Sequence, residues 1–139
     1  MRSWWLLGLL LLPTVSAAAP MDYRFEAVTN TVERGVGVPL QVRALYAATG
    51  QPVPGLEVRD AFVDRSPEGQ VGGSHPAFFT PSLDYGIYSF RADLPVDGRW
   101  ALIFTARIPG EPQPVTASVV FTVVGRLPAP SGTTTATPR

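Results

Sequence analysis

Few side chains in this 139-residue chain could carry out chemistry. There is no cysteine, and all 11 basic residues are arginine, so the chain offers neither a thiol nor a lysine amine as a nucleophile. The single histidine, His75, follows Ser74, but adjacency does not make a nucleophile–base pair, and the sequence marks no third member of a triad. No phosphate-binding loop or zinc-ligand spacing occurs either. We therefore expect a protein that is not an enzyme.

Metal binding depends on His75 and Met21, the only imidazole and the only thioether left once an N-terminal leader is removed. Both groups are ligands for copper, and carboxylates could complete a harder site for Cu(II) or Zn(II). Two ligands on separate segments seldom fix a coordination geometry without further donors. We therefore expect no bound metal or cofactor. The alternative is a copper site at His75, and the simplest interpretation of this residue is a surface histidine without a role.

Three aromatic residues, Phe78, Phe79 and Tyr85, lie close together in a segment rich in Gly and Pro. With His75 they are the candidates for a surface that binds a partner, a sugar or another small ligand. The alternative is that the three rings cap the open end of the fold. Asp60 interrupts an apolar inward face, which predicts either a buried carboxylate paired with arginine or a β-bulge.

The two ends of the chain are expected to lie outside the fold. Residues 1–19 contain a basic start, an apolar run and small residues at a cleavage point, which predicts a signal peptide and a periplasmic or secreted protein. No later segment is apolar for the ~18 residues of a membrane span, so none is expected after cleavage. Residues 127–139 have almost nothing to bury and predict a disordered tail. One domain, residues 21–126, remains.

Within that domain the apolar residues recur with a period of two. Tyr88 and Phe90, for example, alternate with Ser89 and Arg91, which is typical of a half-buried strand. Several such runs, separated by turns rich in Gly and Pro, predict an all-β, antiparallel sandwich of about seven strands. We expect Trp100 to be buried between its sheets.

Two connections are less regular. Asp97 and Gly98, flanked by apolar residues, predict a hairpin between the strands on either side. Residues 65–85 have no clear element over most of their length, although a short strand at 77–80 fits. A long irregular segment in a small domain is usually functional or mobile.

Short stretches across the domain resemble the YtkA-like or FixH-like domains. The matching stretches are residues 22–25, 38–43, 50–53, 64–69, 86–90, 98–102 and 109–111, followed by a Val-rich last strand. The resemblance implies an immunoglobulin-like sandwich that is exported or tethered to a membrane. Some relatives accompany copper or heavy-metal efflux systems or cytochrome oxidase assembly.

The sequence departs from the metal-associated relatives in one loop. Their loop after the Asp-x-Ser-Pro segment is rich in methionine, a soft ligand suited to Cu(I). Here residues 69–75 contain no methionine and offer only His75. The copper function that the resemblance implies is therefore weakened by the residues that should carry it.

The function expected from these observations is an exported binding or interaction module, accessory to a metal efflux or oxidase assembly system. It would present an edge strand or its long loop to a protein partner at the membrane or in the periplasm. A nucleic-acid partner is not expected, because 11 basic residues balance 11 acidic ones. The alternatives are a copper or heavy-metal carrier using His75, and a small-ligand binder using Phe78, Phe79 and Tyr85.

The metal alternative yields a direct test. We predict that the protein binds Cu(I) weakly or not at all, because one imidazole and one thioether on separate segments must also be ordered to meet. Titration with Cu(I) under a competing chelator measures this. Tight one-to-one binding that is abolished by His75→Ala would contradict the prediction.

Overall fold

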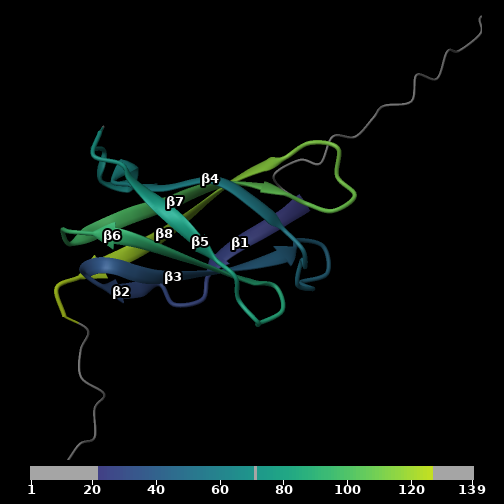
Figure 1. The fold of residues 1–139 in the computed structure, drawn as a ribbon, viewed down its shortest axis with the longest axis horizontal. Helices are drawn as coiled ribbons and strands as arrows, with labels where there is room; N and C mark the ends of the chain where they lie inside the picture. Colours follow the sequence, from purple (N-terminus) through teal and green to yellow (C-terminus); the bar gives the residue numbers. More distant parts are fainter. Residues whose placement is uncertain (1–21, 71, 127–139) are drawn as a thin grey trace, which may run out of the picture.

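The computed structural model describes residues 22–70 and 72–126, which form an all-β fold (Figure 1). The expected signal peptide, Met21 and the expected tail lie outside the described residues. In the described part, no helix is long and apolar enough to cross a membrane. The elements are β1 (Tyr23–Ala27), β2 (Thr31–Glu33), β3 (Gly35–Tyr46), β4 (Glu57–Asp64), the 3-10 helix η2 (Ser66–Glu68), β5 (His75–Thr80), β6 (Ile87–Leu94), β7 (Gly98–Arg107) and β8 (Val115–Val124).

The strands follow one hydrogen-bonded order, β1-β3-β6-β5-β4-β7-β8-β2, which curls into two facing layers (Figure 1). One layer contains β1, β3, β6 and most of β5, and the other contains β4, β7, β8 and β2. Without the three-residue β2, seven strands remain. The first, second, fifth and fourth of them along the chain (β1, β3, β6 and β5) lie side by side in one layer, and the third, sixth and seventh (β4, β7 and β8) lie side by side in the other. This is the strand arrangement of an immunoglobulin-like sandwich. The predicted fold class is confirmed.

The expectation of about seven antiparallel strands needs one correction. The described chain has an additional strand, β2, which pairs in parallel with β8, Thr31 lying opposite Thr122. Three residues are too few to show a period-two pattern, so this strand could not be predicted from the sequence. The residue that follows β2 continues this parallel pairing, since the Arg34 amide also donates to the Val124 carbonyl at 2.8 Å.

The hairpin predicted at Asp97 and Gly98 is wrong. The two residues connect β6 to β7, the next strand along the chain, but these two strands do not pair with each other. β6 pairs with β3 and β5, whereas β7 pairs with β4 and β8. The turn therefore carries the chain from one layer to the other. Leu94 before it and Trp100 after it are both buried, so core burial on two facing sheets decided the pairing and not the turn sequence.

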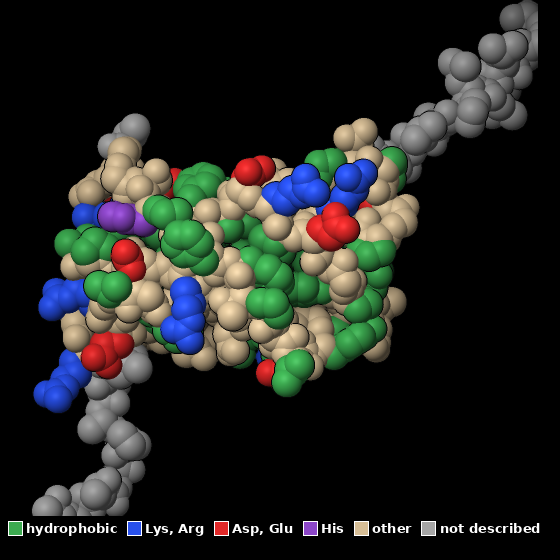
Figure 2. Space-filling model, viewed as in Figure 1, with side chains coloured by type: hydrophobic (Ala, Val, Ile, Leu, Met, Phe, Trp, Pro, Cys, Tyr) green, Lys and Arg blue, Asp and Glu red, His purple; other side chains and the backbone are tan. Residues whose placement is uncertain are grey.

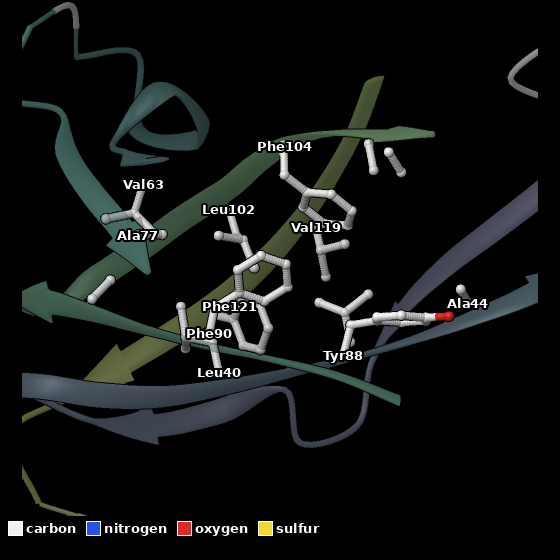
Figure 3. Close-up of a cluster of buried hydrophobic side chains, with 14 of the residues drawn as sticks. Leu40, Ala44, Val63, Ala77, Tyr88, Phe90, Leu102, Phe104, Val119 and Phe121 are labelled. Carbon is white, nitrogen blue, oxygen red and sulfur yellow. The ribbon is translucent and has the colours of Figure 1, made fainter. Parts of the chain in front are cut away.

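The core lies between the layers and is filled by aromatic and branched side chains (Figure 3). The rings of Phe90 from β6 and Phe104 from β7 meet across the layers with centroids 4.9 Å apart. β8 alternates strictly between buried and exposed residues, as a strand with one face on the core must. Trp100 is 2% exposed, which confirms its predicted burial, and its indole N–H donates to the Val96 carbonyl at 3.0 Å.

Asp60 lies at a β-bulge, so the interpretation as a buried carboxylate is wrong. The register of β4 against β7 shifts between Arg59 and Phe62, and Asp60 is exposed with a φ of 53°. A left-handed conformation of this kind is tolerated by Asp better than by most residues. The extra residue also changes which side chains face inward, so that Val63 is fully buried and Phe62 only partly.

Trp100→Ala should lower the free energy of unfolding by about 3–5 kcal/mol, because it removes a large ring from a packed core. Urea unfolding followed by far-ultraviolet circular dichroism measures the change. Val120→Ala on the exposed face of β8 is the matched control and should stay within about 0.5 kcal/mol of the parent. Equal losses in the two variants would contradict the burial argument.

Candidate binding surface

β5 carries three of the four candidate residues but changes partner along its length. Its start pairs with β4, His75 lying opposite Val63, and residues 77–80 pair with β6. Tyr85 lies in the loop between β5 and β6. The start of β5, with His75, is therefore held by β4, whereas Phe78 and Phe79 are held by β6.

His75 packs against the core tryptophan. Its ring centroid lies 5.8 Å from that of Trp100, and the Arg65 guanidinium carbon lies 5.9 Å from the same indole centroid. An Arg65 N–H also donates to the Gln70 side-chain oxygen at 2.9 Å. The described residues contain no group of three or more His, Cys, Asp or Glu side chains that could hold a metal ion, and Met21 lies outside them. What the structure gives His75 is a packing contact that covers part of the indole.

The aromatic candidates belong to an exposed apolar strip. We define the β5 strip as Phe78, Phe79, Leu83 and Tyr85. These are four of the eight large hydrophobic residues that are exposed in the described chain. Phe78 is 66%, Phe79 41% and Tyr85 69% exposed, and Leu83 is fully exposed. Figure 2 shows hydrophobic side chains on the surface over β5 and over the loop that follows it. Half of the exposed apolar residues thus fall within eight consecutive positions of the chain.

Phe78 and Phe79 point to opposite faces of β5, as neighbours on a strand do. The Phe79 ring packs edge-on against the buried Phe90 ring, with centroids 5.7 Å apart, and lies 6.3 Å from Tyr88. Phe78 lies on the outer face, opposite Arg91 of β6. Two interpretations were open for these rings: an exposed binding surface and a cover for the end of the fold. Phe79 fits both, because it covers the core and remains 41% exposed.

Phe79, Leu83 and Tyr85 line a hollow of about 290 Å³ between the turn before β4 and the loop before β6. Pro54 and Pro81 also line it, and Asp84 is its only charged lining residue. A hollow lined by aromatic, aliphatic and proline side chains with one carboxylate can hold a partner's side chain but supplies no acid–base pair. The sequence analysis did not identify Leu83, and an apolar residue within a Pro-Ser-x-Asp turn was the sign that could have revealed it.

Two contacts hold the base of this loop. The Tyr88 hydroxyl donates to the Val53 carbonyl at 2.7 Å and accepts from the Leu56 amide at 3.1 Å, and both contacts are buried. Gly86 has a φ of 75°, and a Cβ there would lie 2.4 Å from the Pro52 Cβ. Only glycine fits this approach, so the loop is fastened to the segment that joins β3 to β4.

Shifted pKa values occur mainly away from the strip. Burial, followed by the 2.6 Å hydrogen bond to Glu111, raises the pKa of Tyr23 to about 12. The backbone amide of Arg99 donates to Glu68 at 2.8 Å and lowers the pKa of that carboxyl. Burial also raises the pKa of Tyr88. These shifts reflect structural contacts, and none brings an acid and a base together.

The two strands at the ends of the strand order, β1 and β2, are short, with five and three residues, and short end strands limit strand addition. Strands inside the order are also interrupted: β4 has the bulge at Asp60, and proline removes an amide donor at Pro39 in β3 and at Pro76 in β5. Recognition through side chains therefore fits this fold better than addition of a partner strand.

A second hollow, of about 570 Å³, runs along β2 and the first half of β3. Its lining includes the buried side chains of Val32 and Val38 and the exposed side chain of Val36. Of its two charged lining residues, Arg34 already pairs with Asp97 at 3.3 Å. The sequence analysis did not find this hollow, because β2 itself was not found.

No family model matches the chain, and no curated protein matches it. Among solved structures, the ZirS C-terminal domain is 14% identical, with a TM-score of 0.43, over 91% of this chain and 82% of that one. The Lin-41 filamin domain is 15% identical, also with a TM-score of 0.43, over 80% of this chain and all of that one. The immunoglobulin-like class of this chain is defined by its own strand order.

Tyr88→Phe should lower the free energy of unfolding by about 2–4 kcal/mol, because the Leu56 amide and the Val53 carbonyl would each lose a buried partner. Tyr85→Phe is the matched control, since that ring is exposed, and should change the value by less than about 0.5 kcal/mol. Chemical unfolding of both variants measures the difference. Two equally small effects would show that the hydroxyl does not hold the loop.

Proposed function

We propose that this protein is an exported, non-enzymatic binding module that presents the β5 strip to a protein partner. The observation that supports the proposal is the concentration of exposed apolar side chains in residues 78–85. Isolated apolar residues are normal on a surface, but a contiguous group usually marks a site of interaction. Export rests on the signal peptide expected at residues 1–19.

The size of the strip supports binding. An aromatic side chain carries roughly 150–250 Å² of surface, so the exposed fractions of the four residues correspond to about 500 Å². This area is divided between the outer face of β5, with Phe78, and the hollow beside it, with the other three side chains. The sum is comparable with the ~300–600 Å² typical of the largest apolar patch on a monomer, and such patches are often functional. Covering the strip would therefore provide a substantial hydrophobic driving force.

The shape of the strip favours a protein over a small molecule. The hollow of about 290 Å³ is at the lower limit of the ~300–1,000 Å³ usual for small-ligand sites. The strip also extends beyond the hollow to Phe78 on the outer face of β5. A partner that approaches the edge of β5 can contact both faces, whereas a small ligand in the hollow would leave Phe78 uncovered. A role beside metal efflux or oxidase assembly remains a prediction of the family resemblance.

Site-specific photo-crosslinking in the host tests the proposal. A crosslinking residue at position 83 should give a discrete protein adduct, because Leu83 is at the exposed tip of the strip. The same residue at position 120, on the other layer, is the control and should give none of that adduct. Excess unlabelled parent protein should reduce the adduct at least about tenfold if the partner is a different protein, and should itself appear in the adduct if the partner is a second copy of this chain.

The competitor also defines the negative result. A competitor carrying Leu83→Ser and Tyr85→Ser should fail to reduce the adduct, since both side chains are exposed and their loss leaves the fold intact. Competition by this variant that equals competition by the parent would refute the proposed surface. So would the same adduct arising from position 120.

A further inference from the structure

The β5 strip lies between an arginine and a carboxylate that have no ion-pair partner in the described chain. Arg91 lies opposite Phe78, is exposed, and donates only to the Gly37 carbonyl, at 3.1 Å. Asp84 is exposed and lies between Leu83 and Tyr85 in the loop. The ion pairs formed within the described residues involve other side chains. The strip therefore carries one exposed charge of each sign that forms no ion pair within the described residues.

This arrangement is self-complementary under a two-fold axis. In an isologous contact, residue i of one copy meets residue j of the other, and j of the first meets i of the second. An axis through the middle of the strip, near Thr80, would bring Arg91 of each copy toward Asp84 of the other. The apolar side chains between them would then face their own counterparts.

The area agrees with a dimer of ordinary size. Two strips of about 500 Å² each would bury about 1,000 Å² of apolar surface. The polar rim, including Thr80, Ser82 and the two charges, would raise the total toward the ~1,200–2,000 Å² of stable interfaces. The chain has a formal net charge of zero, so two copies meet no long-range repulsion.

We infer that the partner of the β5 strip is a second copy of this chain, bound across a two-fold axis with reciprocal Arg91–Asp84 ion pairs. This inference rests on the proposed function, because it identifies the partner of that same surface. A hydrophobic centre with a charged rim is the usual composition of such an interface.

Sedimentation velocity of the purified protein over a range of concentrations tests the inference. We expect a reversible monomer–dimer equilibrium in which Leu83→Ser raises the dissociation constant at least about tenfold. Val120→Ser, also at an exposed valine but on the other layer, should leave it unchanged within about twofold.

Charge reversal tests the two-fold arrangement itself. Asp84→Arg alone should place two arginines opposite each other at both ends of the interface, and Arg91→Asp alone should place two carboxylates there. Each single variant should therefore dimerise at least about tenfold more weakly at low salt. An equimolar mixture of the two should recover the parental affinity, because each arginine then meets a carboxylate.

The outcomes are separable. A protein that remains monomeric at concentrations of about 100 μM, well above the ~1 μM scale of modest complexes, would overturn the inference. The proposed function would still stand if the crosslink at position 83 joined a different protein. A dimer that is insensitive to Leu83→Ser, or single charge variants that do not recover on mixing, would also overturn the inference. In the crosslinking experiment, an adduct of twice the chain mass identifies a second copy, and an adduct of any other mass identifies a foreign partner.

Discussion

The pairing of β5 with two different strands is the constraint on which the rest of this surface depends. At His75 and Pro76 the strand belongs with β4, and from Ala77 onward it belongs with β6. One strand therefore joins the two layers into a single hydrogen-bonded order. The cost of the change is that residues 78–80 lose their neighbour on the β4 side. Phe79 stays partly exposed at this open side of β5, whereas Phe78 is exposed because it points to the outer face of the sheet.

The same change of partner leaves the exposed rings anchored. Phe79 packs against Phe90 and close to Tyr88, and the Tyr88 hydroxyl in turn holds the turn before β4. Gly86 allows the following loop to lie against Pro52. A surface fixed in this way loses little conformational entropy when it is covered, which favours binding. The change of strand partner thus accounts both for the anchoring of Phe79 on the core and for its partial exposure.

Much of the fold could be predicted because burial on one face imposes a period of two on each long strand. That pattern correctly placed Trp100 in the core and indicated the sandwich. The pairing across Asp97 and Gly98 could not be predicted, since a local turn sequence does not state which layer the next strand joins. β2 was hidden for a related reason: its three residues are held by β8, which is distant in sequence. In the candidate surface, the aromatic residues were visible in the sequence, but the packing of His75 against Trp100 and the exposure of Leu83 are consequences of tertiary structure.

An exposed apolar strip on a β-sandwich could also promote aggregation, and the structure of the strand edges bears on this. Strand addition tends to be open-ended, because each added strand presents a new edge. In the described chain the two end strands, β1 and β2, have only five and three residues, so they offer short edges for such growth. A contact made by side chains at one patch, by contrast, is closed when two surfaces have met. Short end strands and an exposed patch of side chains thus fit a closed contact better than open-ended strand addition.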